Sequence, residues 1–131
     1  FIRDEKIEQF KYKLIHTPSQ TVYSSIPHKF QEGYKIFIST TDKYSVFIDN
    51  CGMTQSVVFI ICSNKEQAKK YLQILQHPLY VFINNICRWG NFNNIRILQS
   101  FPIPNIEYSH QELYNYFNIT KEEVEYICIN L

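Results

Sequence analysis

Two clusters of polar residues in this sequence carry side chains suited to reading nucleic acids. Arg pairs bidentately with guanine and Asn or Gln with adenine, while Lys, Ser and Thr bind phosphates. An aromatic ring wedges between base steps or packs on a sugar. The first cluster is Ser39–Lys43, at the end of a predicted strand, with Met53–Ser56 before the next strand, and the second is Cys87–Asn94. The candidate DNA-contacting residues within or beside these clusters are Lys35, Ser39, Thr40, Thr41, Lys43, Thr54, Gln55, Arg88, Trp89, Asn91, Phe92, Asn93, Asn94 and Arg96.

The same residue types also have a purely structural explanation. Ser and Thr commonly end strands and Asn favours turns. A large aromatic side chain such as Trp89 is often part of the core. The spacing of the residues alone therefore leaves both interpretations open.

No arrangement of residues predicts catalysis. The four histidines lie on different elements or loops, and the sequence has no G-x-S-x-G elbow, H-E-x-x-H pair or Gly-rich phosphate loop. Cys51 has no base or cation close to it in sequence that would activate a thiol nucleophile. Asp42 and Asp49 fit a turn and a strand end better than a metal pair. We expect no catalytic residue and no metal site in this chain.

The four cysteines lie far apart and form no C-x-x-C pair, which argues against a zinc site. Cys62, Cys87 and Cys128 interrupt apolar stretches, where a free Cys behaves as a small buried hydrophobe. This pattern predicts free thiols in a reducing, cytoplasmic compartment.

The elements that position these clusters are predicted to be strands first and helices later. Runs of β-formers bounded by turn residues predict strands at 12–16, 21–24, 34–39 and 44–49, the last two forming a hairpin. Residues 57–62 are apolar at both odd and even positions, which predicts a central strand covered on both faces. Residues 94–101 alternate between apolar and polar types and predict one more strand.

Capping patterns mark the helices. Ser63 with Glu66 predicts a helix to about Gln76, and Pro78 suits the first turn of a helix over 79–89 that Gly90 ends. Two further capping boxes, at 109–112 and 120–123, predict helices over 111–117 and 121–130. The fold class is therefore α+β: a mixed, largely antiparallel sheet, two consecutive helices packed on it, and a C-terminal helical pair.

Length and composition bound the class of protein. The chain has 131 residues with 45% hydrophobic types, which predicts one domain and excludes intrinsic disorder. We divide it into a core, residues 10–104, and an acidic helical appendix, residues 105–131. Because the chain begins at Phe1 rather than Met, we expect a fragment of a longer protein. No apolar run approaches the ~20 residues of a membrane-spanning helix, so no membrane is expected as a partner.

The net charge of +1 conceals an uneven distribution of charge. Residues 1–96 hold 12 basic and 7 acidic residues, a net charge of +5, whereas residues 97–131 hold 1 basic and 5 acidic residues, a net charge of −4. A basic body is a modest indication of a polyanionic partner.

Two long stretches of this sequence, Tyr34–Asn64 and Leu75–Pro104, resemble a known family. They are similar to the target recognition domain that follows the catalytic domain in adenine-specific (N6) DNA methyltransferases of restriction–modification systems. These include type II enzymes of the Eco57I-like and TaqI-like groups. A third stretch, Phe10–Ser25, is similar to the entry strand of that domain.

The resemblance implies a specificity module that binds double-stranded DNA and works with an N-terminal methyltransferase domain of the same chain. The catalytic motif of the family, Asn/Asp-Pro-Pro-Tyr/Phe, is absent here, since Asn105 follows Pro104 instead of preceding it. The resemblance therefore implies that S-adenosylmethionine binds in the missing catalytic domain and that this fragment holds no cofactor. It implies no particular base-contacting residue, because the recognition domains share no fixed code.

Two other functions stay open. The C-terminal helices are predicted to carry an apolar stripe that docks a partner protein or packs on the body; its residues are Leu113, Tyr116, Phe117, Val124 and Ile127. The other open function is that of a stand-alone small enzyme, and the main argument against it is that the sequence contains no catalytic constellation. The DNA hypothesis requires a shared, exposed side of the molecule for Thr41, Gln55, Arg88 and Asn93.

Overall fold

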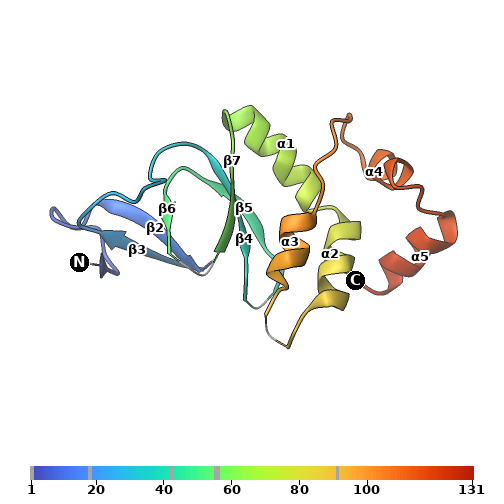
Figure 1. Cartoon of the computed structure of the whole chain (residues 1–131), viewed down its shortest axis with the longest axis horizontal. Helices are drawn as coiled ribbons and strands as arrows, with labels where there is room; N and C mark the ends of the chain where they lie inside the picture. Colours follow the sequence, from blue (N-terminus) through green and yellow to red (C-terminus); the bar gives the residue numbers. More distant parts are fainter. Residues whose placement is uncertain (1, 18, 42, 55–56, 91) are drawn as a thin grey trace.

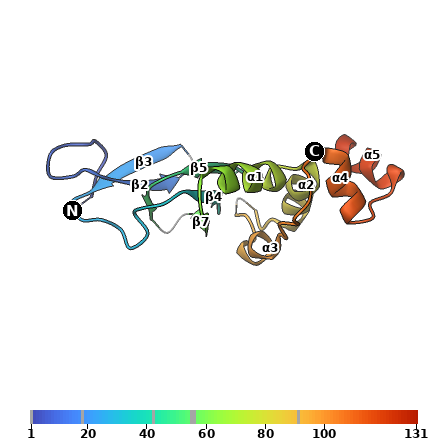
Figure 2. The ribbon, with the colours of Figure 1, turned by 90° about the horizontal axis from the view of Figure 1, so that it is seen from above.

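The strands lie at one end of an elongated molecule and the helices lie at the other (Figures 1 and 2). The structure, a computed structural model, describes residues 2–17, 19–41, 43–54, 57–90 and 92–131. Within these ranges the strands form two sheets. The first has the order β1 (Ile2–Arg3), β3 (Gln20–Ser24), β2 (Tyr12–Thr17), β6 (Gly52–Met53), and the second β5 (Val46–Asp49), β4 (Lys35–Ser39), β7 (Val57–Ile61).

Most strand pairs are antiparallel, as predicted. The hairpin of β4 and β5 is confirmed, with Ile36 opposite Ile48. The pairing of β2 with β6 is parallel, which makes the first sheet mixed. The α+β class predicted from the sequence is thus the class of the structure.

The central strand of the second sheet is β4, and the prediction that residues 57–62 form the central strand is wrong. All five residues of β4 are buried. Ile36 and Ile38 belong to the cluster that includes the helices, while Phe37 belongs to a cluster with Ile15 and Met53 of the first sheet. The second sheet therefore lies between the helices and the first sheet. Both faces of β7 are covered for the same reason, although β7 is an edge strand. Its continuous apolar pattern therefore shows that layers pack on both faces of the sheet, and it does not show which strand is central.

The five helices of the described ranges are α1 (Lys65–Leu75), α2 (Pro78–Cys87), α3 (Ile95–Ser100), α4 (His110–Tyr116) and α5 (Lys121–Ile129). α1 packs on β5 and β4, and α2 contacts both α3 and α5. The longest of them has 11 residues, and none of the described helices is long and apolar enough to cross a membrane.

The predicted N-caps of α4 and α5 are confirmed and that of α1 is shifted by one residue. The predicted stop of α2 at Gly90 is wrong, because α2 ends at Cys87 with Arg88 as its C-cap. Ser109 and Thr120 are the N-caps of α4 and α5. The N-cap of α1 is Asn64 instead of Ser63: its Oδ1 accepts from the backbone N–H of Gln67, and the Gln67 side chain accepts from the N–H of Ser63. This pair satisfies backbone donors in the way a capping box does, one residue later than the sequence pattern suggested.

Residues 95–100 form the helix α3, so the predicted strand at 94–101 is wrong. Asn94 caps this helix, since its Oδ1 accepts from the N–H of Arg96. The buried side chain of α3 is Leu98, whereas the strand hypothesis rested on the alternation of Ile95 and Ile97 around Arg96. A run of so few residues fits either period, and the capping Asn favours the helix.

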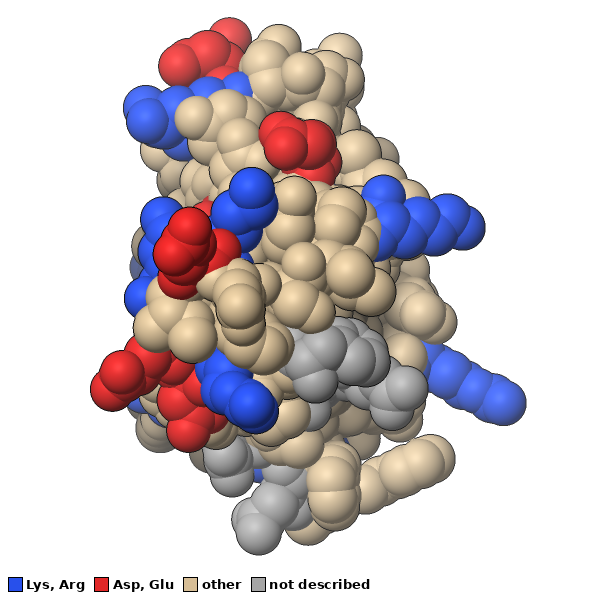
Figure 3. Space-filling view, turned by 90° about the vertical axis from the view of Figure 1, so that its left-hand side faces the viewer, with Lys and Arg blue, Asp and Glu red and all other residues tan. Residues whose placement is uncertain are grey.

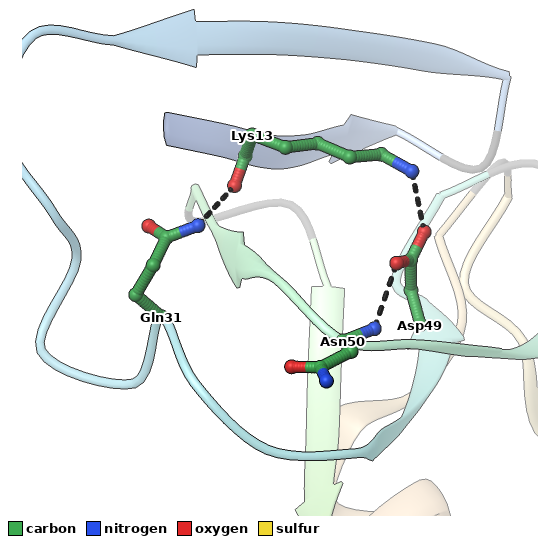
Figure 4. A network of polar contacts seen from close by, with 4 residues as sticks. All are labelled: Lys13, Gln31, Asp49 and Asn50. Atoms are coloured by element: carbon green, nitrogen blue, oxygen red, sulfur yellow. Dashed lines mark hydrogen bonds and ion pairs between the residues drawn. The ribbon is translucent and has the colours of Figure 1, made fainter. Parts of the chain in front are cut away.

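An ion pair ties the two sheets together (Figure 4). Lys13 Nζ of β2 lies 2.8 Å from Asp49 Oδ2 of β5, and Gln31 Nε2 donates to the backbone oxygen of Lys13 at 2.8 Å. The hydrogen bond to Asp49 raises the pKa of Lys13. Because both side chains are partly exposed, the pair fixes geometry more than it stabilises the fold.

The cysteines are free thiols. Cys51 and Cys62 are buried, and burial raises the pKa of Cys51 to about 12, which removes it as a nucleophile. Cys87 is half-buried. Cys128 is exposed, so the prediction that it is a buried hydrophobe is wrong; on α5 the buried position is Ile127.

Candidate nucleic-acid interface

The second polar cluster meets the 39–43 part of the first at the carboxyl end of β4, on the lower edge of Figure 1, whereas Met53 and Thr54 lie with the first sheet. We call this region the β4 end and define it as residues 39–43 and 88–94, of which the structure describes all but 42 and 91. The backbone N–H of Asn93 donates to the oxygen of Thr40 at 3.0 Å, and Thr41 forms a β-bridge with Phe92. Residues about fifty positions apart in the chain thereby share one surface.

The tip of the β4 end is a tight turn that presents two aromatic rings. The N–H of Trp89 donates to the oxygen of Phe92 at 3.0 Å, and the reverse bond measures 3.1 Å. Gly90 adopts a left-handed φ of 62°, a conformation that favours glycine. Trp89 is 72% exposed and Phe92 is 61% exposed, so the prediction that Trp89 could belong to the core does not hold here.

A buried chain of amides holds this turn against β4. Asn84 Nδ2 of α2 donates to Asn93 Oδ1 at 3.1 Å, and Asn93 Nδ2 donates to the backbone oxygen of Ser39 at 2.7 Å. The Ser39 hydroxyl donates to the oxygen of Thr41. Asn84, Asn93 and Ser39 are all buried. Asn93 and Ser39 therefore position the turn and have no surface to offer DNA, which corrects their assignment as contacts.

Sequence reasoning missed Asn84. A signal was present: Asn84 is a polar residue in the middle of the apolar helix α2, and a polar side chain there is normally hydrogen-bonded. Its Oδ1 atom is buried and has no hydrogen-bond partner in the described part of the chain.

Lys35 also lies where its side chain does not contact DNA phosphates. It lies at the opposite end of β4 from Ser39, and its exposed fraction is 1%. Its ammonium donates to the backbone oxygens of Glu32 at 3.0 Å and Gly33 at 2.7 Å. Burial lowers the pKa of Lys35. This lysine closes the turn before β4 and does not reach the β4 end, which corrects its assignment as a phosphate contact.

The cations available at or beside the β4 end come from three different segments. Lys43 follows β4, Arg88 is the C-cap of α2, and Arg96 lies in the first turn of α3. Lys43 and Arg96 are exposed. Arg88 is half-buried, and its Nε is buried without a hydrogen-bond partner among the described residues.

The remaining candidates divide between structural roles and positions that stay open. Asn94 uses its side chain to cap α3. Thr54 lies on the first sheet, where its hydroxyl is 2.9 Å from His16 Nδ1. Thr40 and Thr41 are half-buried. Gln55 and Asn91 lie outside the described residues.

The condition set from the sequence is met in part. Thr41 and Arg88 share the β4 end and keep part of their surface, whereas Asn93 is at that end but buried. The end of the molecule that carries the first sheet shows acidic side chains beside basic ones along one edge, with basic side chains projecting from the other (Figure 3). The positive charge of the body is therefore spread over this face and forms no single basic patch on it.

No protein-family model, no curated protein and no solved structure matches this chain. The interpretation of the β4 end thus rests on its own residues.

Proposed function

We propose that this chain is a DNA-binding target recognition domain that gives sequence specificity to an adenine-N6 DNA methyltransferase of a restriction–modification system. The observation that carries the proposal is the β4 end. Residues 39–41 and 88–93, distant in sequence, meet there beside two exposed aromatic rings, Trp89 and Phe92. Large exposed aromatic side chains commonly mark interaction surfaces.

In this proposal the two aromatic rings contact the groove of the DNA, and the neighbouring cations provide most of the affinity for it. Trp89 and Phe92 would contact sugars or base steps of the duplex. Lys43, Arg88 and Arg96 would bind the phosphates on either side. The bonds between Trp89 and Phe92 and from Asn93 to Ser39 are made within the protein before DNA binds, which lowers the entropy cost of placing the two rings.

The proposal assigns no methyl transfer to this chain. S-adenosylmethionine and the target adenine would be held by an N-terminal methyltransferase domain of the same protein in the cytoplasm. This chain would grip the duplex while that domain extrudes the adenine, because such enzymes act on a base outside the helix.

The salt dependence of DNA binding tests the proposal. Three phosphate contacts predict a slope of log K against log salt of about −2.7 for a random-sequence duplex, and each lost contact removes about 0.9. We expect Arg88→Ala and Arg96→Gln each to reduce the slope by that amount in fluorescence anisotropy. In ¹⁵N spectra, duplex DNA should shift the amides of 40–43 and 88–96.

A matched control is Lys65→Gln, because Lys65 is also exposed but lies on α1. It should leave the slope unchanged. The proposal is wrong if the arginine variants bind DNA like the parent chain while remaining folded, or if DNA shifts the amides of α5 instead of those of the turn.

A protein-interaction module remains the second candidate, and one observation favours it. Tyr126 is 61% exposed and Ile129 is 82% exposed on α5. The stripe predicted from the sequence is only partly available, however, since Leu113 and Ile127 are buried in the core while Tyr116 is exposed. A partner would have to use a different surface of the helical end.

A further inference from the structure

An apolar groove crosses α2 at the helical end of the molecule. It consists of two adjoining hollows of about 270 and 340 Å³ that share Leu79, Ile83 and Ile119. One hollow extends toward α3, where Ile97 lines it. The other extends toward α5. We call this feature the helical groove; it is separate from the β4 end.

The charge along the helical groove is of one sign. The charged residues that line the two hollows are Glu122 and Glu123 of α5. Both are exposed, and Lys121, the neighbouring cation, lines neither hollow. The apolar floor therefore has an acidic edge on its α5 side. An occupant complementary to it carries apolar side chains next to Lys or Arg.

The lining restricts how an occupant can bind. The lining residues belong to α2, α3, α5 and the segments that follow α3 and α4. None belongs to a described strand, so a partner cannot add a strand to a sheet edge there. A mode that suits an apolar groove between helices is a helix laid in it, with apolar anchors at i, i+3/i+4 and i+7.

A second copy of this chain is a poor occupant. Its basic helix is α1, with Lys65, Lys69 and Lys70, but the apolar side chains of α1 (Ala68, Ile74 and Leu75) are already buried. We therefore take a helix from another protein as the occupant.

We propose that the helical groove binds a basic amphipathic helix of a partner protein, with apolar side chains over Leu79, Ile83 and Ile119 and a Lys or Arg beside Glu122 and Glu123. The 10 residues of α2 correspond to a length of about 15 Å, so the bound helix has about three turns. This proposal does not depend on DNA binding at the β4 end.

The test uses the whole chain and two synthetic amphipathic peptides of about 12 residues. Both carry Leu at the anchor positions; one carries Lys beside them and the other carries Glu. We expect the Lys peptide to bind and to shift the ¹⁵N amides of Ile83 and Ile119. The Glu peptide should bind about fivefold more weakly or worse, as expected when an exposed ion pair becomes a repulsion.

Two variants with matched controls locate the site. Glu122→Lys should weaken the Lys peptide about fivefold, whereas Glu125→Lys, a residue of the same helix that lines neither hollow, should have no effect. Ile83→Ser should weaken binding about tenfold, and Ile86→Ser on the same helix should not, because Ile86 is 66% exposed and lines neither hollow.

Three outcomes would overturn the proposal. The first is equal binding of the two peptides, or no binding of either up to about 1 mM. The second is amide shifts outside the groove. The third is a dimer of the chain alone that Ile83→Ser dissociates in sedimentation, which would make a second copy the occupant. Circular dichroism of each variant establishes that it is folded, and Glu122→Lys keeps the test decisive if Ile83→Ser does not fold.

Discussion

The β4 end and the helical end are built on opposite principles. The β4 end is held by hydrogen bonds between residues far apart in sequence, with buried amides beneath exposed rings and cations. The helical end is held mainly by apolar packing of α2, α4 and α5. Its polar bonds are local caps together with two longer-range bonds to backbone oxygens, from His77 to His110 and from Tyr80 to Pro102. The comparison teaches that a polar network defines the position of one loop, whereas apolar packing leaves a surface able to accept another apolar element.

The largest effect is expected from a core truncation at the helical end. Leu113→Ala removes a fully buried side chain and should lower the free energy of unfolding by about 2–5 kcal/mol. The measurement is urea unfolding followed by circular dichroism. Ile129→Ala, a truncation at an 82% exposed position, is the control and should stay within about 0.5 kcal/mol. Similar losses for both would mean that α4 is not packed as described.

A smaller loss is expected at the β4 end. Asn93→Ala leaves Asn84 Nδ2 and the Ser39 oxygen without their partner, which should cost about 1–3 kcal/mol in urea unfolding. Amide hydrogen exchange should accelerate in the turn at 88–92 before it does in α4. The exposed Asn85→Ala serves as the control. Uniformly faster exchange across both ends would contradict the division between them.

Removing the N-cap of α5 tests how much a local cap stabilises the helical end. Thr120 Oγ1 accepts from the N–H of Glu123 at 3.2 Å, and the Glu123 carboxylate accepts from the N–H of Thr120 at 2.8 Å. The bond from the Thr120 backbone N–H to the carboxylate lowers the pKa of Glu123. Thr120→Ala should reduce stability by about 1 kcal/mol, and Thr120→Ser should retain most of it. If Ser rescues nothing, the capping box does not stabilise α5.

The smallest effect expected is a pH dependence centred on His77. This buried side chain accepts from the N–H of Leu79 through Nδ1 and donates from Nε2 to the oxygen of His110, each at 3.0 Å. Burial lowers the pKa of His77. The folded state therefore binds fewer protons than the unfolded state, so stability is lost as the pH falls below about 6.5, the ordinary value.

The measurement for His77 is the difference in melting temperature between about pH 7.5 and about pH 5.5. His77→Asn keeps a capping oxygen but has no titrating ring, so its melting temperature should fall less between the two pH values. His110 packs against His77, with ring centroids 4.9 Å apart, and remains in both proteins. An identical pH profile for the two proteins would exclude His77 as the source.

Much of the secondary structure followed from local signals. The caps Ser109 and Thr120, the hairpin of 34–39 with 44–49 and the start of α2 at Pro78 all involve residues close together in the chain. The strand predicted at 94–101 was wrong because a six-residue helix offers too few positions to establish a period. The choice of central strand was wrong because β4 and β7 are covered on both faces alike.

The sequence predicted which residue types would form the candidate site, and the structure showed which of those residues are exposed. Trp89, Phe92, Lys43 and Arg96 are exposed, while Lys35, Ser39 and Asn93 have the same chemistry but are buried. Side-chain type cannot separate the two groups, because their burial depends on contacts with segments tens of residues away.

The sequence by itself determined where the helices with clear caps begin, most of the segments that form strands, and the absence of the G-x-S-x-G, H-E-x-x-H and Gly-rich phosphate-loop motifs. These properties depend on hydrogen bonds and steric preferences within a few residues. Only the tertiary structure established the order of the strands, the meeting of residues 39–41 with residues 88–93 at the β4 end, and the groove between α2, α3 and α5. Those features depend on long-range packing, in which each residue's environment is set by chain segments that the local pattern does not specify.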